Sequence, residues 1–254
     1  MRKKTVIANF KIQKTNTEIK EYIKSFKKLV KGKDTANIGL CVSHTDLITA
    51  VKLAKRTNII ICAQNINENE KGAYTGEISA AMLKDIGVKA TLIGHSDRRK
   101  NYNETNATVN KKVVRALAEG IMPIVCIGET LDERNNGKTN AILRAQLKEG
   151  FKGVSKEDFL KVIIAYEPVW SISPGPVPTD KQIIEAMATI RKIIASIYDK
   201  ETAENTIVQY GGSANEKNVD RLAALKGVDG ALVGAACLNP VTFNAVVDGF
   251  LNAK

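Results

Sequence analysis

Short apolar runs recur along the chain and alternate with longer amphipathic segments. Runs rich in Val, Ile and Leu predict eight strands, at residues 5–8, 38–42, 59–63, 91–94, 124–127, 162–165, 206–209 and 230–233. Their apolar residues are continuous rather than alternating, which is typical of strands buried on both faces. The intervening segments carry apolar residues at helical spacing, most clearly at 18–29, 109–118 and 181–197.

This alternation of strands and helices predicts β-α-β units and a parallel sheet. Eight such units in 254 residues fit a closed (β/α)8 TIM barrel better than an open sheet. No linker rich in Gly, Ser or Pro and no break in composition divides the sequence. We therefore expect an α/β protein with a single domain over residues 1–254.

Composition narrows the class of protein. With 44% hydrophobic and 26% charged residues the chain is of ordinary globular type, and no apolar run approaches the ~18 residues of a membrane helix. The net charge is +11, but the lysines are scattered and aromatic residues do not interleave with them, so we expect neither a nucleic-acid nor a membrane partner. No cysteines are paired as C-x-x-C, which favours reduced thiols and a cytoplasmic protein; they are Cys41, Cys62, Cys126 and Cys237.

Titratable residues follow several predicted strands, at the barrel end where (β/α)8 enzymes carry their chemistry. Burial at the mouth of the barrel would raise the pKa of Glu167 and make it a stronger base, although a lone Glu can also cap a helix or form a salt bridge. His95 lies where a helix begins at Ser96, and the positive helix end favours a neutral imidazole. Lys11 could stabilise negative charge on a substrate; a structural His95 and a surface Lys11 are the plainer alternatives.

Small residues follow the last two strands. Gly211-Gly212-Ser213 and Gly234 allow close approach of the backbone, and phosphate sites after strands seven and eight recur in this fold, although tight turns without a ligand remain an alternative. A base, a neutral acid, a cation and an anion site at one barrel end suit proton abstraction next to a carbonyl of a small phosphorylated substrate.

The sequence resembles the triosephosphate isomerase family in an ordered set of motifs over nearly its whole length. The motifs are Asn9-Phe10-Lys11, Ala63-Gln64-Asn65, Gly72-Ala73-Tyr74-Thr75-Gly76-Glu77, Gly94-His95-Ser96-Asp97-Arg98-Arg99, Cys126-Ile127-Gly128-Glu129-Thr130, Ala165-Tyr166-Glu167-Pro168-Val169-Trp170, Tyr210-Gly211-Gly212-Ser213 and Leu232-Val233-Gly234.

The resemblance implies interconversion of D-glyceraldehyde 3-phosphate and dihydroxyacetone phosphate, a step of glycolysis and gluconeogenesis, without cofactor or metal. It implies Glu167 as the base, His95 as the neutral electrophile, and Asn9 and Lys11 as electrostatic partners. It places the phosphate against Ser173, Gly212, Ser213, Gly234 and Ala235, and gives supporting roles to Asp97, Glu129 and Thr75. It also implies a homodimer formed through the loop at residues 65–79, in which Thr75 reaches the neighbouring subunit's site; a solvated insertion is the alternative for that loop.

Three departures from the family pattern bear on these roles. Asp97 stands in place of Glu, and its shorter side chain is expected to lie further from Lys11. Ala235 replaces a Gly and would be strained if its φ were positive. The loop at 171–178 carries Ser171 in place of Ala and is rich in proline, which predicts altered lid kinetics or substrate fit.

Two alternatives stay open at this point. The same chemistry could act on a related sugar phosphate such as a tetrulose phosphate. In a different class, the barrel could be a weakly active anion-binding scaffold.

Overall fold

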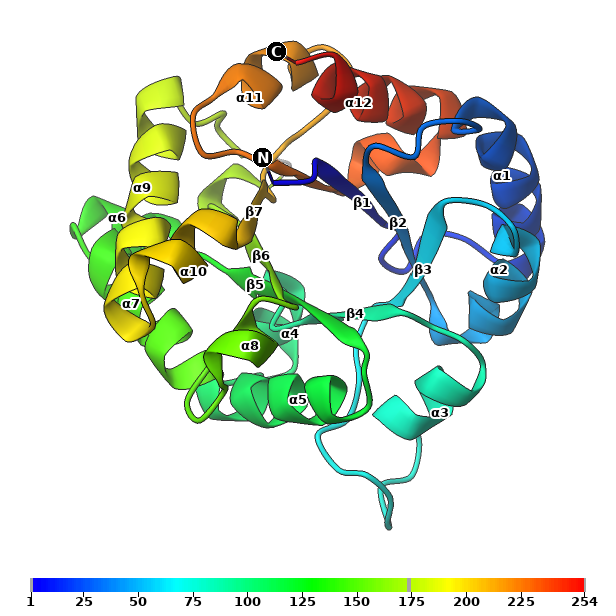
Figure 1. Ribbon diagram of the computed structural model, residues 1–254, viewed down its shortest axis with the longest axis horizontal. Coiled ribbons are helices and arrows are strands. Elements are labelled where there is room, and N and C mark those ends of the chain that lie inside the picture. Colours follow the sequence, from blue (N-terminus) through cyan, green and yellow to red (C-terminus); the bar gives the residue numbers. More distant parts are fainter. Residues whose placement is uncertain (1, 173–174, 254) are drawn as a thin grey trace.

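Eight parallel strands, paired in sequence order, close into a barrel because β1 pairs with both β2 and β8 (Figure 1). The structure is a computed structural model that describes residues 2–172 and 175–253. The strands are β1 (Thr5–Asn9), β2 (Asn37–Val42), β3 (Ile59–Ala63), β4 (Ala90–Ile93), β5 (Met122–Ile127), β6 (Ile163–Tyr166), β7 (Ile207–Tyr210) and β8 (Gly230–Val233). The predicted (β/α)8 barrel is confirmed, and every predicted strand matches an observed one to within two residues.

Helices surround the barrel and connect consecutive strands (Figure 1). They are α1 (Asn16–Leu29), α2 (Leu47–Ala54), α3 (Ala80–Asp85), α4 (Ser96–Asn101), α5 (Asn106–Ala118), α6 (Leu131–Asn135), α7 (Thr139–Gly150), α8 (Lys156–Phe159), α9 (Asp180–Ile197), α10 (Lys200–Asn205), α11 (Val219–Ala224) and α12 (Pro240–Asn252). Three short 3-10 helices, η1 (His44–Asp46), η2 (Val169–Ser171) and η3 (Ala235–Leu238), follow β2, β6 and β8.

Local sequence explains where the helices begin. In α1 the side chain of Thr15 accepts a hydrogen bond from the Glu18 N–H, and the Glu18 side chain accepts one from the Thr15 N–H. This capping box satisfies two backbone donors that the first turn leaves free. The predicted helix at 18–29 was therefore correct in kind but began two residues late, because capping rather than apolar spacing sets the start.

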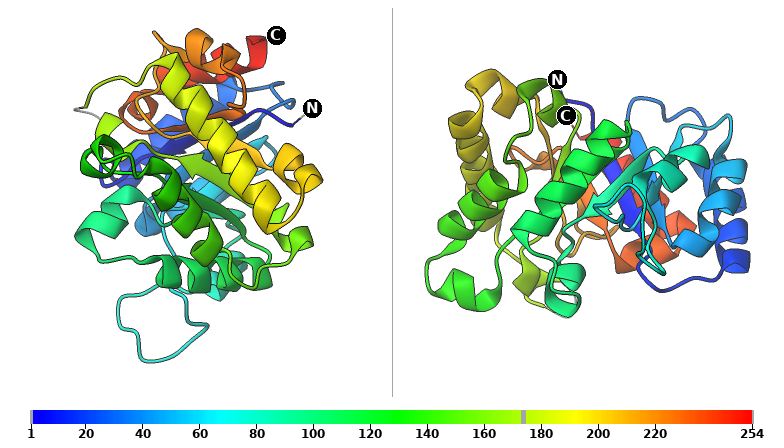
Figure 2. Two further views of the ribbon diagram at one scale, coloured as in Figure 1. Left: turned by 90° about the vertical axis from the view of Figure 1, so that its left-hand side faces the viewer. Right: turned by 90° about the horizontal axis from the view of Figure 1, so that it is seen from below.

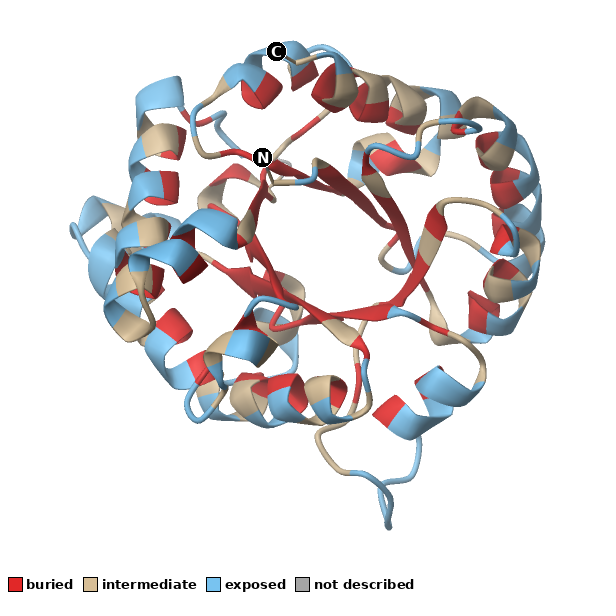
Figure 3. Ribbon diagram, viewed as in Figure 1, coloured by how far each residue is buried: buried red, intermediate tan, exposed pale blue. Residues whose placement is uncertain are grey.

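The core has two parts, one inside the barrel and one between the strands and the helices. Figure 3 shows buried residues along the strands and on the helix sides that face them. The interior is filled by small and branched side chains, including Ile7, Leu92 and Ile163 together with three of the cysteines. All four cysteines of the chain are buried and unpaired. The outer layer buries one stripe of each long helix, such as Ile19, Tyr22, Ile23 and Phe26 of α1. Since the interior is packed, chemistry is left to the loops at the strand ends.

The loop between β3 and α3 projects from the barrel (Figure 2). Residues 71–77 of this loop are exposed. Among the described residues no helix is both long enough and apolar enough to cross a bilayer.

Candidate active site

A pocket of about 650 Å³ opens at the C-terminal ends of the strands. Four predicted catalytic residues line it from three strand ends: Asn9 at the end of β1 and Lys11 just beyond it, His95 beyond β4, and Glu167 beyond β6. The predicted phosphate residues Gly212, Ser213, Gly234 and Ala235 line the same pocket. Ser173 lies outside the described residues. The barrel thus brings together eight of the nine residues predicted to act on or bind substrate, and their roles remain predictions.

Glu167 and His95 face each other at the floor of this pocket. His95 Nε2 lies 3.0 Å from Glu167 Oε1, and both side chains are almost fully buried. The second carboxylate oxygen, Oε2, accepts a hydrogen bond of 3.0 Å from the backbone N–H of Ser96. Sequence reasoning missed this backbone donor, which a helix start at Ser96 could have indicated.

These two donors change the expected acidity of the carboxyl group. Burial alone would raise the pKa of Glu167, but His95 and the Ser96 N–H together hold it below its usual range. The expectation of a raised pKa was therefore wrong for this arrangement. The physical reason is that the His95 ring and the Ser96 N–H favour the carboxylate more than burial disfavours it.

His95 caps α4, and its Nδ1 accepts a hydrogen bond of 3.1 Å from the Asp97 N–H. In that arrangement Nδ1 carries no proton, and Nε2–H donates to Glu167. Burial lowers the pKa of His95, but Glu167, helped by the carboxylate of Asp97, raises it above its ordinary value. The expected helix start at Ser96 is confirmed, whereas the expected preference for a neutral ring is opposed by the two carboxylates.

Hydrogen bonds hold the strained backbone of Lys11 at the edge of the pocket. Its φ is +50°, in the left-handed region that non-glycine residues rarely adopt. The Lys11 N–H donates to Asn9 Oδ1 over 3.1 Å, and the Gln64 amide donates to the Lys11 carbonyl over 2.9 Å. A strained backbone conformation persists only where neighbouring groups fix it. These hydrogen bonds at the end of β1 therefore fix the backbone from which the Lys11 side chain extends.

Asp97 reaches Lys11 in spite of its short side chain. Lys11 Nζ lies 3.0 Å from Asp97 Oδ2, and the same oxygen lies 3.5 Å from His95 Nδ1. The expectation that Asp97 would lie further from Lys11 was therefore wrong. The start of α4 carries the carboxylate close enough for one oxygen to lie near both Lys11 and the His95 ring.

Two glycines leave room for Glu167. A Cβ on Gly128 would lie 1.6 Å from the Glu167 carbonyl oxygen, and a Cβ on Gly211 would lie 2.8 Å from Glu167 Cγ. Both glycines belong to motifs visible in the sequence. Only the close approach of neighbouring strand ends explains why neither position has space for a Cβ beside Glu167.

The predicted phosphate side of the pocket is lined by backbone. A Cβ on Gly234 would meet no atom within 4 Å, so open space lies above it. Among the described non-glycine residues only Lys11, Arg56 and Asn103 have positive φ. The strain considered for Ala235 is therefore absent, and η3 begins at this residue in an ordinary conformation.

Glu129 lies behind the pocket rather than in it. Its carboxylate is fully buried and accepts hydrogen bonds from Tyr166 Oη and Trp170 Nε1, and it pairs with Arg134 at 3.1 Å. The Arg134 guanidinium stacks 4.7 Å from the centre of the Trp170 ring. This buried carboxylate therefore fixes η2, which begins two residues after Glu167.

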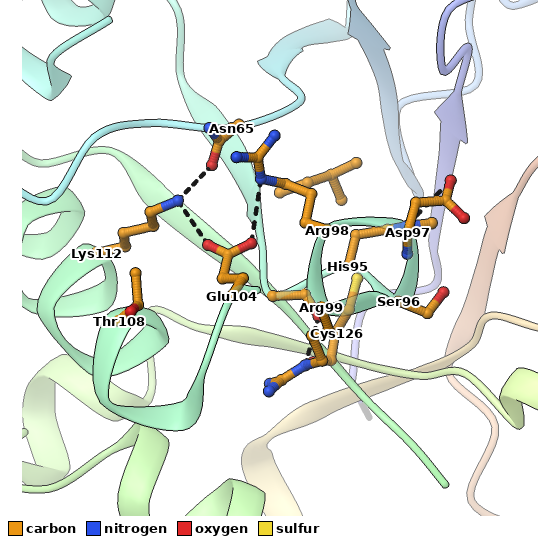
Figure 4. A network of polar contacts seen from close by, with 12 residues as sticks. Asn65, His95, Ser96, Asp97, Arg98, Arg99, Glu104, Thr108, Lys112 and Cys126 are labelled. Atoms are coloured by element: carbon orange, nitrogen blue, oxygen red, sulfur yellow. Dashed lines mark hydrogen bonds and ion pairs between the residues drawn. The ribbon is translucent and has the colours of Figure 1, made fainter. Parts of the chain in front are cut away.

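A buried ion-pair network supports the segment after His95 (Figure 4). Glu104 accepts a hydrogen bond from Arg98 over 3.1 Å and pairs with Lys112 at 2.6 Å, and Lys112 also donates to Asn65 over 2.8 Å. The network joins α4 to the base of the projecting loop. Thr75 itself is exposed in that loop and is absent from the lining of its own chain's pocket.

Fold and site together define a closed parallel barrel with a carboxylate, an imidazole and a lysine around one pocket at its C-terminal strand ends. No group of three or more His, Cys, Asp or Glu side chains within residues 2–172 and 175–253 is arranged to hold a metal ion.

Comparison with known proteins identifies the family. Residues 4–250 match the family model described as triosephosphate isomerase. The chain is 43% identical over 247 residues to triosephosphate isomerase of Dictyoglomus thermophilum, covering 97% of this chain and 99% of the relative. It is 44% identical over 248 residues to that of Caldanaerobacter subterraneus subsp. tengcongensis, covering 98% and 100%. A crystal structure of triosephosphate isomerase from Bartonella henselae matches with a TM-score of 0.89 at 31% identity, covering 98% and 100%. The chain belongs to the triosephosphate isomerase family.

Proposed function

We propose that this chain interconverts D-glyceraldehyde 3-phosphate and dihydroxyacetone phosphate. The observation that carries the proposal is the 3.0 Å contact between Glu167 and His95 in a pocket that also contains Lys11. A carboxylate and a ring N–H at this spacing can act on a carbon and on the adjacent oxygen of one small substrate.

In the proposed reaction Glu167 removes the proton from C2 of the aldehyde, while the electrons of the C–H bond form the enediol double bond. The Nε2–H of His95 donates to the carbonyl oxygen as negative charge develops there. Glu167 then returns its proton to C1, and His95 recovers a proton from the C2 hydroxyl as the ketone forms. The positive charge of Lys11 stabilises the enediolate oxygens.

The low pKa of Glu167 in the ligand-free arrangement is compatible with its role as a base. To reach a substrate carbon, the carboxylate must leave the His95 ring and the Ser96 N–H that now hold it. Losing both donors in a dry pocket raises its pKa, because burial then acts without compensation. Basicity thus appears where the substrate is bound.

The phosphate of the substrate is proposed to bind at Gly212, Ser213, Gly234 and Ala235. Support comes from the open space above Gly234 and from the place of these residues in the same pocket. Backbone N–H groups of small residues bind phosphate at close range. A contact from Ser173 is part of this proposal, although that residue is outside the described residues.

We also propose a homodimer formed through the loop at 65–79, with Thr75 directed toward the partner's site. A second pocket, of about 530 Å³, adjoins the first and shares Asn9, Lys11 and His95 with it. Apolar side chains that a monomer would leave in water line it, Ile12 being 96% and Tyr102 67% exposed. A projecting loop from a second copy suits this pocket and would shield Lys11 from solvent.

We also propose a cytoplasmic location, which the buried, unpaired cysteines support.

A coupled assay with D-glyceraldehyde 3-phosphate tests the reaction. Wild type should turn over, and Glu167→Gln, which keeps size and removes the base, should lose several orders of magnitude in kcat. Asp220→Asn, on α11 outside the site, is the matched control and should keep full activity. A wild-type chain without activity, or an active Glu167→Gln variant, would contradict the proposal.

Sedimentation velocity tests the dimer, which Thr75→Arg should weaken.

A further inference from the structure

Two buried hydroxyl groups lie against the turn proposed to bind phosphate. Ser171, the last residue of η2, and Tyr210, the last residue of β7, are both 0% exposed. A Cβ on Gly212 would lie 2.2 Å from the Tyr210 hydroxyl and 2.6 Å from Ser171 Oγ. Both hydroxyls therefore touch the Gly212 backbone, and their positions and that of the turn depend on each other.

Neither hydroxyl has a hydrogen-bond partner among the described residues. Buried polar groups in proteins are nearly always paired, so two unpaired hydroxyls side by side require an explanation. Burial raises the pKa of Tyr210, and the neighbouring Ser171 hydroxyl opposes this rise, which agrees with the two groups being close together.

The same two segments are already joined by one bond. The Ser213 hydroxyl donates to the Ser171 carbonyl over 2.9 Å, and the Asn218 amide donates to the Ser213 carbonyl over 2.9 Å. Ser171 therefore contacts the turn through its backbone and through its side chain, and a small shift of the turn changes both contacts.

We propose that Ser171 is a positioning residue, whose hydroxyl forms a hydrogen bond with Tyr210 when an anion occupies the turn at Gly211–Ser213. The bond holds the turn in the form that binds the anion, and it gives each hydroxyl the partner that it lacks in the ligand-free structure. The inference rests on the proposed function only in taking the anion to be the substrate's phosphate.

The test is a double-mutant cycle with Ser171→Ala, Tyr210→Phe and the double variant. The probe is inorganic phosphate, measured both by calorimetry and as a competitive inhibitor. Each single variant should weaken phosphate binding and raise KM about 3- to 10-fold, the range of one net hydrogen bond, with little change in kcat. The double variant should be no weaker than either single one, because both remove the same bond.

Tyr198→Phe is the control, since its hydroxyl donates to the Val154 carbonyl away from the pocket; it should leave phosphate binding unchanged. The alanine in Ser171→Ala is the residue of the family pattern, and thermal melting checks that each variant folds. Unchanged phosphate affinity in the single variants, or effects that multiply in the double variant, would overturn the inference. Because calorimetry needs no turnover, an inactive wild type would contradict the proposed function and leave this cycle readable.

Discussion

Gly211→Ala should slow the reaction by displacing the carboxylate of Glu167. The new Cβ would lie 2.8 Å from Glu167 Cγ, which is 0.6 Å closer than the 3.4 Å at which ordinary contact begins. The backbone cannot easily give way, because the Gly211 N–H donates to the Tyr166 carbonyl over 2.7 Å. A displacement of about 1 Å in a reacting group costs roughly a hundredfold, so a shift of about 0.6 Å should lower kcat roughly 10- to 20-fold, or about 1.4–1.8 kcal/mol.

Steady-state assays in both directions would measure this effect on kcat. The φ of Gly211 is not positive, so alanine brings no backbone strain of its own. Gly150→Ala is the matched control, because its Cβ would meet Val109 at an ordinary 3.5 Å and full activity is expected. A folded Gly211→Ala variant with kcat within twofold of wild type would refute the claim that this spacing positions the base.

Three further outcomes are expected. The chain has only two histidines, so NMR can follow the His95 ring. In Glu167→Gln the pKa of His95 should fall relative to wild type, because burial lowers this pKa and the carboxylate that raises it is gone. An unchanged titration of His95 would count against the pairing. Asp97→Ala should lower kcat about 10- to 100-fold by releasing Lys11. A melting experiment on the same variant should show less than about 1 kcal/mol of lost stability, because the ion pair between Lys11 and Asp97 is partly exposed. A larger loss of stability would indicate a structural role for Asp97 instead. Glu129→Gln should cost about 1–3 kcal/mol in urea unfolding, because it leaves buried donors without a charged partner, and unchanged stability would contradict that account.

Much of the fold could be predicted because its signals are local. Continuous apolar runs such as residues 59–63 specify strands buried on both faces, and their alternation with helical stripes leaves few topologies. Helix starts were less accurate: α5 begins at Asn106, whereas apolar spacing began at residue 109, because the Thr105 side chain caps the helix. Apolar periodicity carries no information about such caps.

The site could be predicted only at the level of strand ends. Position after a strand placed Lys11, His95 and Glu167 near one another, because parallel strands present the same end to one face. The direction of the pKa shift of Glu167 could not be predicted, since it depends on the close contact with His95 and on the Ser96 N–H, both supplied by another strand's loop. The reach of Asp97 likewise depends on how α4 starts, a matter of three-dimensional geometry rather than side-chain length.

The contacts among the charged groups explain how one site can contain both a base and a neutral acid. Lys11, Asp97, His95 and Glu167 form a continuous line with contacts of 3.0, 3.5 and 3.0 Å. Lys11 and the start of α4 hold Asp97 in place, whereas Glu167 must move to reach a substrate carbon. When it moves, His95 loses the carboxylate that most raises its pKa, while burial still lowers it. The step that makes Glu167 a stronger base therefore also favours the neutral form of His95, which donates through Nε2.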